Sequence, residues 1–323
     1  MLKNNSLAII GPTASGKSFL AVELAKKING EIIGLDSRQI YKNMGIGTAQ
    51  PTIVEQDGIE HHLIGIKSPT EKISAGAYSK LVYNLVEDIF SRNHIPILCG
   101  GSGLYYRAIT RGIFKESKTD LKIRHELENE YNKHGADDLM SQLVAVDPDY
   151  AKNVHLNNKK RLIRALEIYR STGKPPTQHY NEQLNNPINK TLNLFTIYLE
   201  WEKSELNNRI QMRTKSMLNA GWIDEVKQLL KKYPNTSIPP LDSIGYREIV
   251  SYLNDKITIT DLEELISLKT KQFSSRQTKW FRKEQIDLII EMKSDRSPKK
   301  YVIKFLIKFR LDELVFIVKE MYY

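Results

Sequence analysis

The stretch Gly11-Pro12-Thr13-Ala14-Ser15-Gly16-Lys17-Ser18 matches the P-loop pattern G-x-x-x-x-G-K-[ST] near the start of the chain. An apolar run at residues 7–10 precedes it, and from Lys17 onward apolar residues recur at helical spacing. Between a strand and a helix, such a loop turns backbone N–H groups and the positive end of the helix toward phosphate. Lys17 is expected to reach the terminal phosphates, and Ser18 to hold magnesium. The loop predicts binding of a di- or triphosphate, a class that includes ATP and pyrophosphate esters.

The composition of the 323 residues limits which classes of protein the chain can belong to. Lys and Arg total 48 against 38 Asp and Glu, an excess of +10 that fits polyanionic partners or simple solubility. No apolar run is long enough to cross a bilayer and the start lacks a secretory apolar region, so we expect a cytoplasmic protein without membrane contact. The single cysteine, Cys99, excludes an internal disulfide and a cysteine-rich zinc site, and its apolar surroundings indicate a core residue.

Short apolar strands alternate with helices through the first third of the chain. Strands are predicted at residues 7–10, 31–35 and 95–99, and helices from residue 17, over residues 75–91 and from residue 104. This alternation predicts an α/β fold of P-loop NTPase type, in which a parallel sheet carries helices on both faces.

The middle of the chain differs in character, because strands vanish and charged, helical periodicity takes over. We therefore predict three parts: residues 1–116 as the first part of the core, residues 117–190 as an all-helical insertion, and residues 191–323 as the return of the core. The last part should hold a strand at 194–199, helices at 204–232 and 262–283, a strand at 286–290 and a basic amphipathic helix from 298. The pair His61-His62 is interpreted as a structural turn, since the seven histidines show no metal-ligand spacing.

Asp36 ends the second predicted strand and is the first candidate for chemistry. A hydrolase would use such a residue to hold magnesium, and a plain strand-end cap is a further interpretation. However, this strand directly follows the P-loop helix, a region that faces the acceptor in P-loop small-molecule kinases. A carboxylate on the acceptor side is therefore the favoured interpretation.

Seven segments together resemble the bacterial tRNA dimethylallyltransferases, also called tRNA isopentenyltransferases. They are residues 11–18, Asp36-Ser37-Arg38-Gln39-Ile40-Tyr41, Gly45-Ile46-Gly47-Thr48-Ala49-Gln50-Pro51, Gly100-Gly101-Ser102-Gly103-Leu104-Tyr105, Lys160-Arg161-Leu162-Ile163-Arg164-Ala165-Leu166-Glu167, Ser243-Ile244-Gly245-Tyr246-Arg247-Glu248 and Arg276-Gln277-Thr278-Lys279-Trp280-Phe281-Arg282. They span almost the whole chain, and in this order they are far more specific than the P-loop alone. The resemblance implies an enzyme that transfers a dimethylallyl group from its diphosphate to the exocyclic amine of the adenosine immediately 3′ of the anticodon in tRNA, releasing diphosphate.

The resemblance also implies a role for each matching residue. Asp36 is the implied general base, and Thr13, Lys17 and Arg213 are implied to act on the diphosphate, with Ser18 holding it through magnesium. The implied diphosphate or nucleotide site is Gly11, Pro12, Thr13, Ala14, Ser15, Gly16, Lys17 and Ser18. The implied tRNA contacts are Asp36, Ser37, Arg38, Gln39, Ser102, Arg124, Lys160, Arg161, Leu162, Ile163, Arg164, Ser243, Ile244, Gly245, Tyr246, Arg247, Glu248, Arg276 and Gln277. The expected partners are the anticodon stem-loop of tRNA and dimethylallyl diphosphate, the expected cofactor is magnesium, and the expected state is a monomer.

Local sequence leaves some of these assignments open. Residues 160–164 fit a solvated helix face packed by Leu162 and Ile163 as well as an RNA contact. In residues 276–282 we expect the arginines and Gln277 to face RNA and Trp280 to pack inside. The chain departs from the family at Gly45, where an acidic residue is usual, and at Gln50, where a lysine usually precedes proline. The acceptor contacts of that segment stay open for this reason.

Three other functions are each compatible with part of the sequence. The first is a kinase that passes phosphate from ATP to a small acceptor. The second is a prenyltransferase that uses free AMP, ADP or ATP, against which the long helical insertion and the basic tail argue. The third is a non-catalytic RNA-binding module, against which the complete P-loop argues.

Overall fold

Six strands form one parallel sheet in this computed structural model, which describes residues 6–112, 120–185, 191–234 and 236–294. The strands are β1 (Ser6–Ile10), β2 (Gly30–Leu35), β3 (His61–His62), β4 (Ile95–Gly100), β5 (Leu194–Trp201) and β6 (Leu288–Met292). Their order is β3-β2-β4-β1-β5-β6, and every neighbouring pair is parallel. The predicted parallel sheet with accompanying helices is confirmed. All residues of β1, β2 and β4 are buried, as expected for strands covered on both faces.

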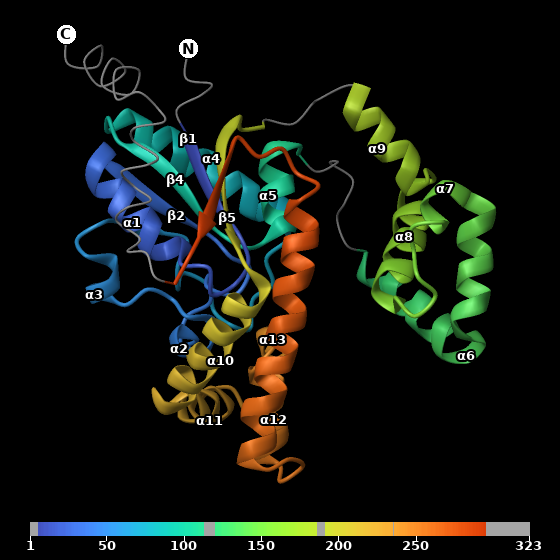
Figure 1. The fold of residues 1–323 in the computed structure, drawn as a ribbon. Coiled ribbons are helices and arrows are strands. Elements are labelled where there is room, and N and C mark those ends of the chain that lie inside the picture. The colour runs from blue at the N-terminus through green and yellow to red at the C-terminus, as the bar shows by residue number, and fades with distance from the viewer. Residues whose placement is uncertain (1–5, 113–119, 186–190, 235, 295–323) are drawn as a thin grey trace. The chain divides into compact units, whose positions relative to one another are not determined.

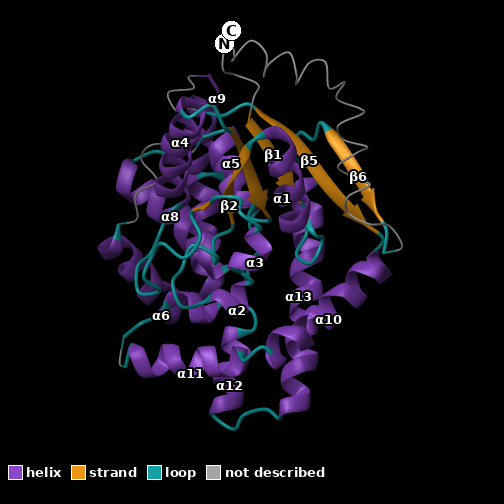
Figure 2. Cartoon of the chain, turned by 90° about the vertical axis from the view of Figure 1, so that its left-hand side faces the viewer, coloured by secondary structure: helices purple, strands orange, loops and turns teal. Residues whose placement is uncertain are grey.

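Helices cover both faces of this sheet (Figures 1 and 2), with α1 on one face and α4 and α5 on the other. The helices of this part of the chain are α1 (Lys17–Ile28), α2 (Gly45–Thr48), α3 (Ile53–Gln56), α4 (Ala75–Ser91), α5 (Gly103–Thr110), α10 (Lys203–Asn219), α11 (Trp222–Lys232), the 3₁₀ helix η1 (Pro239–Asp242), α12 (Tyr246–Leu253) and α13 (Ile259–Phe281). Under α1, apolar side chains such as Leu20 and Leu24 pack on Ile9, Ile97 and Ile197 of the sheet. No helix in the described part of the chain combines the length and apolarity needed to cross a bilayer.

The carboxyl-terminal ends of the strands all lie at one edge of the sheet. Figure 1 shows α2, α3 and the helices α10 to α12 gathered beyond this edge. In an open parallel sheet, ligands bind in the crevice outside these strand ends. Topology alone therefore points to this edge as the place for a site.

Residues 111–191 form a compact unit of their own. Its helices are α6 (Leu121–Val146), α7 (Pro148–Ala151), α8 (Lys159–Thr172) and α9 (Pro176–Asn185). α6 is interrupted at Gly135, whose φ of 87° is left-handed. The unit has a separate core, which includes Leu127, Leu139, Leu143 and Leu162. The helical insertion was predicted at residues 117–190, and both of these bounds lie outside the described residues.

Several predicted elements need correction. The single helix expected at residues 204–232 is two helices, α10 and α11, because Gly221 has a left-handed φ of 95° and ends the first. α12 was not predicted, since a helix of eight residues shows little periodicity. His61 and His62 form the edge strand β3, and not a turn. The basic helix expected from residue 298 lies outside the described residues.

Candidate active site

The P-loop connects β1 to α1 at the crevice edge of the sheet. Gly16 occupies the position before the helix with φ 87°, a left-handed conformation that glycine adopts without steric cost, and it offers no side chain to cap the helix. The amide groups of the first turn of α1 are therefore available to an anion. Local sequence is sufficient to build this part of the site.

Lys17 folds back over the loop. Its Nζ donates hydrogen bonds to the carbonyl oxygen of Pro12 at 2.6 Å and to Oγ of Ser15 at 3.4 Å. Burial lowers the pKa of Lys17 to about 8, an effect to which Arg213 adds and which Cys99 and Asp36 oppose. A buried ammonium that lacks a full counter-charge gains most from an arriving diphosphate.

Helix α10 places two arginines on the same side of the loop. Arg213 Nη1 donates to Oγ1 of Thr13 at 3.1 Å, and Arg209 Nε donates to the carbonyl oxygen of Ala14 at 2.8 Å. The guanidinium of Arg209 stacks on Trp201 at 4.4 Å, and Nε1 of Trp201 donates to the carbonyl oxygen of Ser15 at 2.9 Å. Burial lowers the pKa of both arginines, which nevertheless stay protonated. Three side chains thus hold successive loop residues in place.

Arg213 was predicted as a site residue, whereas Arg209 and Trp201 were not. A signal for Arg209 exists, because it precedes Arg213 by one helical turn and so lies on the same helix face. Trp201 ends β5, next to β1 in the sheet, but strand order cannot be read from the sequence alone.

Asp36 follows β2 directly and is half-buried. Its Oδ1 accepts hydrogen bonds from the backbone N–H groups of Arg38 at 2.8 Å and Gln39 at 3.4 Å. Within the described part of the chain, Oδ2 has no hydrogen-bond partner. Next to it, the N–H of Ser37 donates to Oγ of Ser102 at 2.9 Å, which ties the loop after β2 to the loop after β4. The carboxylate is thus held by one oxygen, and the other remains able to accept a proton.

Two cavities meet at these groups. The larger has a volume of about 1120 Å³ and is lined by the P-loop from Thr13 to Ser18. The smaller, of about 340 Å³, is lined by Ser37, Arg38, Ser102, Ser243, Ile244 and Tyr246, all of them expected tRNA contacts. Thr13, Asp36 and Arg213 line both cavities. The structure therefore brings the predicted diphosphate residues and part of the predicted acceptor residues to one place.

Other expected tRNA contacts have buried side chains. Gln277 is 7% exposed: its Oε1 accepts from the N–H of Thr13 at 2.8 Å, and its Nε2 donates to the carbonyl oxygen of Gly101 at 2.9 Å. The expectation that Gln277 faces RNA is wrong for this side chain, because both ends of its amide bind backbone. Glu248 is buried as well and accepts from the N–H of Gly245 and from Lys269. On the same segments Arg247 and Arg276 are exposed, and Trp280, expected inside, is half-buried against Arg107.

The remaining expected contacts belong to the unit of residues 111–191. Leu162 and Ile163 pack in its core, so the solvated-face interpretation holds for these two side chains. Lys160 and Arg161 are exposed on α8. Arg164 forms an ion pair with the buried Glu167 at 2.8 Å, and Arg124 lies 4.0 Å from the same carboxylate.

The segment after Asp36 is fixed by Glu225, a residue of α11 that the sequence patterns did not single out. Its carboxylate accepts from the N–H groups of Ile46 at 2.7 Å and Gly47 at 3.0 Å, and from the hydroxyl of Tyr246 at 2.7 Å. Trp222 packs so closely on Gly47 that any side chain at that position would collide with it. This explains why glycine is required at position 47. It also explains why a substitution on α11 would alter the segment that contains Ile46 and Gly47, at the crevice.

The two departures from the family pattern lie next to each other. A side chain added at Gly45 would begin 3.7 Å from Oε1 of Gln50. Nε2 of Gln50 donates to the carbonyl oxygens of Gln39 and Tyr41, both at 2.7 Å, while Nε2 of Gln39 donates to that of Ala49 at 2.7 Å. Two uncharged glutamine side chains thus link the beginning and the end of this loop.

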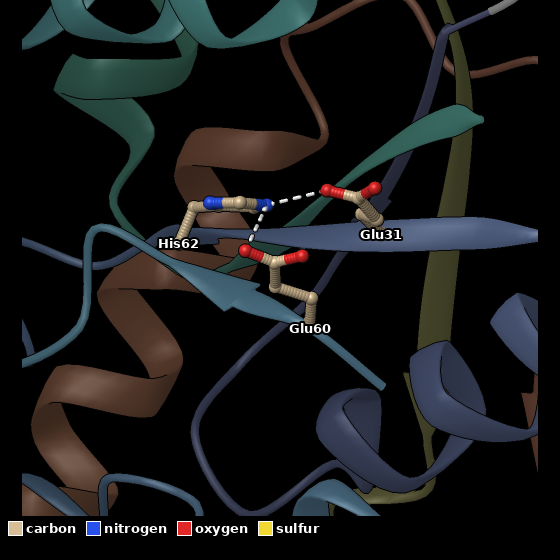
Figure 3. A group of neighbouring side chains, drawn as sticks. All are labelled: Glu31, Glu60 and His62. Atoms are coloured by element: carbon tan, nitrogen blue, oxygen red, sulfur yellow. Dashed lines mark hydrogen bonds and ion pairs between the residues drawn. The ribbon is translucent and has the colours of Figure 1, made fainter. Parts of the chain in front are cut away.

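A third group of ionisable residues lies away from both cavities (Figure 3). Glu31, Glu60 and His62 bring one possible metal-ligand atom each within 4.8 Å of one another. Glu31 is already bound by Arg92, whose Nη2 lies 2.8 Å from Oε2, and by His62 at 2.7 Å. Burial would raise the pKa of Glu31, but the hydrogen bonds from Arg92 and His62 outweigh it and lower the pKa to about 2. Ion pairs and hydrogen bonds at the edge of the sheet therefore account for this cluster without a metal ion.

Two further residues singled out by the sequence, Cys99 in β4 and Ser18 in the first turn of α1, differ in burial. Cys99 is buried in the core cluster under α1, as expected, and burial raises the pKa of its thiol to about 11, which disfavours the nucleophilic thiolate near neutral pH. Ser18 is exposed and lines the larger cavity, whose wall also includes Glu23. One hydroxyl and one carboxylate in the same cavity suit magnesium, which usually takes few protein ligands and completes its shell with phosphate and water.

Comparison with known proteins agrees with this geometry. The family model described as IPP transferase matches residues 39–284. The chain is 40% identical to the tRNA dimethylallyltransferase of Acetivibrio thermocellus over 281 residues, which cover 87% of this chain and 89% of that protein. A crystal structure of the full-length tRNA isopentenylpyrophosphate transferase from Bacillus halodurans matches 99% of this chain and 100% of its own, with a TM-score of 0.70 and 34% identity. A eukaryotic dimethylallyltransferase acting on tRNA matches 97% of this chain and 80% of its own, with a TM-score of 0.81 and 27% identity. The chain belongs to the IPP transferase family.

Proposed function

We propose that this protein transfers a dimethylallyl group from dimethylallyl diphosphate to the exocyclic amine of the adenosine immediately 3′ of the anticodon in tRNA, releasing diphosphate. The observation that carries the proposal is the meeting of the two cavities at Thr13, Asp36 and Arg213. The larger cavity has the P-loop for a diphosphate, and the smaller has the residues expected to contact tRNA. A transfer between two substrates needs such a shared wall.

On the leaving-group side, the protein gathers positive charge where negative charge develops. Lys17, Arg213 and the amide groups at the start of α1 would bind the diphosphate oxygens as the allylic C–O bond breaks. Oγ1 of Thr13 is held by Arg213 and so would stay in a fixed position beside the breaking bond. Magnesium bound through Ser18 would add further charge neutralisation to the diphosphate.

On the acceptor side, Asp36 would act as the general base. Its Oδ1 is fixed by two backbone N–H groups, so Oδ2 would accept the proton that the adenine amine loses as the new C–N bond forms. A base stacked in an RNA loop has to be extruded to reach this point, and the smaller cavity is the place for it. We propose that the exposed Lys160, Arg161, Arg247 and Arg276 bind tRNA phosphates and that the protein acts as a monomer.

The test is an incubation of the protein with labelled dimethylallyl diphosphate, with and without tRNA, and separately with AMP or ADP. Label transfer to tRNA alone is expected, at the adenosine next to the anticodon. Transfer to the free nucleotides would show that they, and not tRNA, are the acceptor. A parallel incubation with γ-labelled ATP should give no phosphoryl transfer, and appearance of labelled product there would restore the kinase as the function.

A further inference from the structure

We propose that Gln277 is a positioning residue that sets the distance between the diphosphate side and the acceptor side of the site, an inference that rests on the proposed transfer reaction. Gln277 belongs to α13, and its carboxamide lies between two loops of the sheet edge. Its Oε1 accepts from the N–H of Thr13 in the P-loop, and its Nε2 donates to the carbonyl oxygen of Gly101 in the loop after β4. The bonds are 2.8 and 2.9 Å long, well within the usual range, and the residue is buried.

These two bonds are the central part of a longer chain of contacts. Gly101 precedes Ser102, whose N–H donates to the carbonyl oxygen of Leu35 at 3.2 Å and whose Oγ accepts from the N–H of Ser37 at 2.9 Å. Leu35 and Ser37 flank Asp36 in the sequence. A continuous path therefore runs from Thr13, beside the leaving group, through Gln277 and Ser102 to both neighbours of the proposed base.

Strand order explains why such a bridge is needed. β4 lies between β1, which carries the P-loop, and β2, which ends at Leu35 just before Asp36. The loops that follow these strands are not paired by the sheet, so side chains must set their spacing. Transfer of an allylic group depends on this spacing, because a displacement of about 1 Å between reacting groups can cost ~10²-fold in rate.

The amide of Gln277 packs closely against Gly101. A side chain at Gly101 would collide with Nε2 of Gln277, and its Cβ would also lie 3.2 Å from the carbonyl oxygen of Gly11. Both polar ends of Gln277 are engaged by backbone, so it acts on the reaction through Thr13 and Gly101. This assignment replaces the direct RNA contact expected from the sequence.

The chemistry of the two bonds gives a test that a merely structural residue would not pass. Gln277→Leu removes both bonds and should lower the single-turnover transfer rate by ~10-fold to 10²-fold, with dissociation constants for tRNA and dimethylallyl diphosphate within a few-fold of the wild type. Gln277→Glu keeps the acceptor for Thr13, but its ionised form turns a carboxylate oxygen toward the carbonyl of Gly101. Protonation of that carboxyl restores a donor, and burial favours the protonated form. The transfer rate of this variant, divided by that of the wild type, should therefore rise as the pH falls from about 8 to about 6.

Control variants distinguish this positioning role from a general disturbance of α13. Ser274→Ala alters a buried position one turn earlier on α13 and should leave the rate and its pH profile unchanged. Gly101→Ala should reproduce the rate defect of Gln277→Leu, and the double variant should be no slower than either single one. Amide exchange at Thr13 should accelerate in Gln277→Leu, a readout that does not depend on activity.

Each result decides the role of Gln277. A wild-type rate in Gln277→Leu, a rate ratio for Gln277→Glu that does not change with pH, or unchanged amide exchange at Thr13 would each overturn the inference. A defect confined to tRNA affinity would return Gln277 to RNA contact. If the wild-type protein itself fails to prenylate tRNA, the proposed function fails, whereas the exchange measurement still decides whether Gln277 holds the P-loop.

Discussion

Thr13 and Arg213 are joined by a hydrogen bond of 3.1 Å between Oγ1 of the threonine and Nη1 of the arginine, 200 residues apart in the chain. The N–H of the same threonine is held by Gln277. Thr13 is thus fixed through its side chain by α10 and through its backbone by α13. A residue held from two sides by distant helices is restrained before any ligand enters, so its place at the junction of the two cavities is preorganised.

The affinity for dimethylallyl diphosphate should fall as the pH rises through about 8. Burial lowers the pKa of Lys17 to about 8, so its amine in the free protein loses the proton near this pH, and with it the charge that binds the diphosphate. A bound diphosphate raises the pKa again, and binding near pH 8 should therefore take up a proton. Calorimetry in buffers of different ionisation enthalpy measures this uptake.

Two variants isolate the contribution of Lys17 from the titration of the ligand itself. Lys17→Ala should bind dimethylallyl diphosphate more weakly, lose most of its turnover and show less proton uptake than the wild type. Lys27→Ala changes an exposed lysine on the same helix and should behave as the wild type. Equal pH dependence in the Lys17→Ala and wild-type proteins would show that another group titrates.

The affinity for tRNA should fall linearly with salt on a logarithmic scale, because phosphate contacts release counterions. Lys160 and Arg161 are exposed on α8. Replacing both by Gln should reduce the slope by ~0.7 to 0.9 for each phosphate that the protein no longer neutralises. Lys152→Gln, at a side chain that is 74% exposed in the same unit, is the matched control. Equal slopes for the double variant and the wild type would place the tRNA on another face.

Arg164 is unsuited to that experiment. It pairs with Glu167, whose carboxylate is fully buried, so neutralising Arg164 would leave this buried charge with the more distant Arg124, at 4.0 Å, as its ion-pair partner. A loss of stability would then be mistaken for weaker tRNA binding.

Glu225→Ala should lower the free energy of unfolding by about 1–3 kcal/mol, the range for buried groups that lose a hydrogen-bond partner. The change leaves the N–H groups of Ile46 and Gly47 without the carboxylate that accepts from them, and the hydroxyl of Tyr246 keeps the carbonyl oxygen of Met44, at 3.2 Å, as its acceptor. Denaturant unfolding measures the effect. Tyr246→Phe, which removes one of the three donors, should cost less, and Asp224→Ala, at the exposed neighbouring position, should cost little. A Glu225→Ala protein as stable as the wild type would contradict the role of this carboxylate.

The sequence predicted well those features that local pattern determines. The P-loop and its flanking strand and helix follow from contiguous residues, and Asp36 follows from the end of a buried strand. α4 was predicted with its bounds, because Ser74 caps its start through the N–H of Ala77 and apolar residues recur along its length. These are short-range signals, and the structure adds little to them.

What escaped prediction depends on contacts between distant parts of the chain. Gln277 was assigned to RNA because residues 276–282 resemble a tRNA-contacting segment of the family, whereas its partner Thr13 lies 264 residues away. Glu225 was missed for the same reason, being separated from Ile46 by 179 residues. The break between α10 and α11 was missed because apolar spacing continues across Gly221, whose left-handed backbone alone ends the helix. Such features come from tertiary packing and have no local pattern.

Asp36→Asn tests the proposed base directly. The amide keeps a carbonyl oxygen to accept from the N–H groups of Arg38 and Gln39, so the loop after β2 should keep its shape. The other position becomes an NH₂ group, which donates and cannot take a proton. Single-turnover transfer should therefore fall by ~10²-fold or more, the range for loss of a general base, while the dissociation constants for tRNA and dimethylallyl diphosphate change little. Asp88→Asn, at an exposed position on α4, should transfer at the wild-type rate. If Asp36 held magnesium instead, the variant would bind the diphosphate poorly and excess metal would restore transfer; that result, or transfer at the wild-type rate, would remove Asp36 from the role of base.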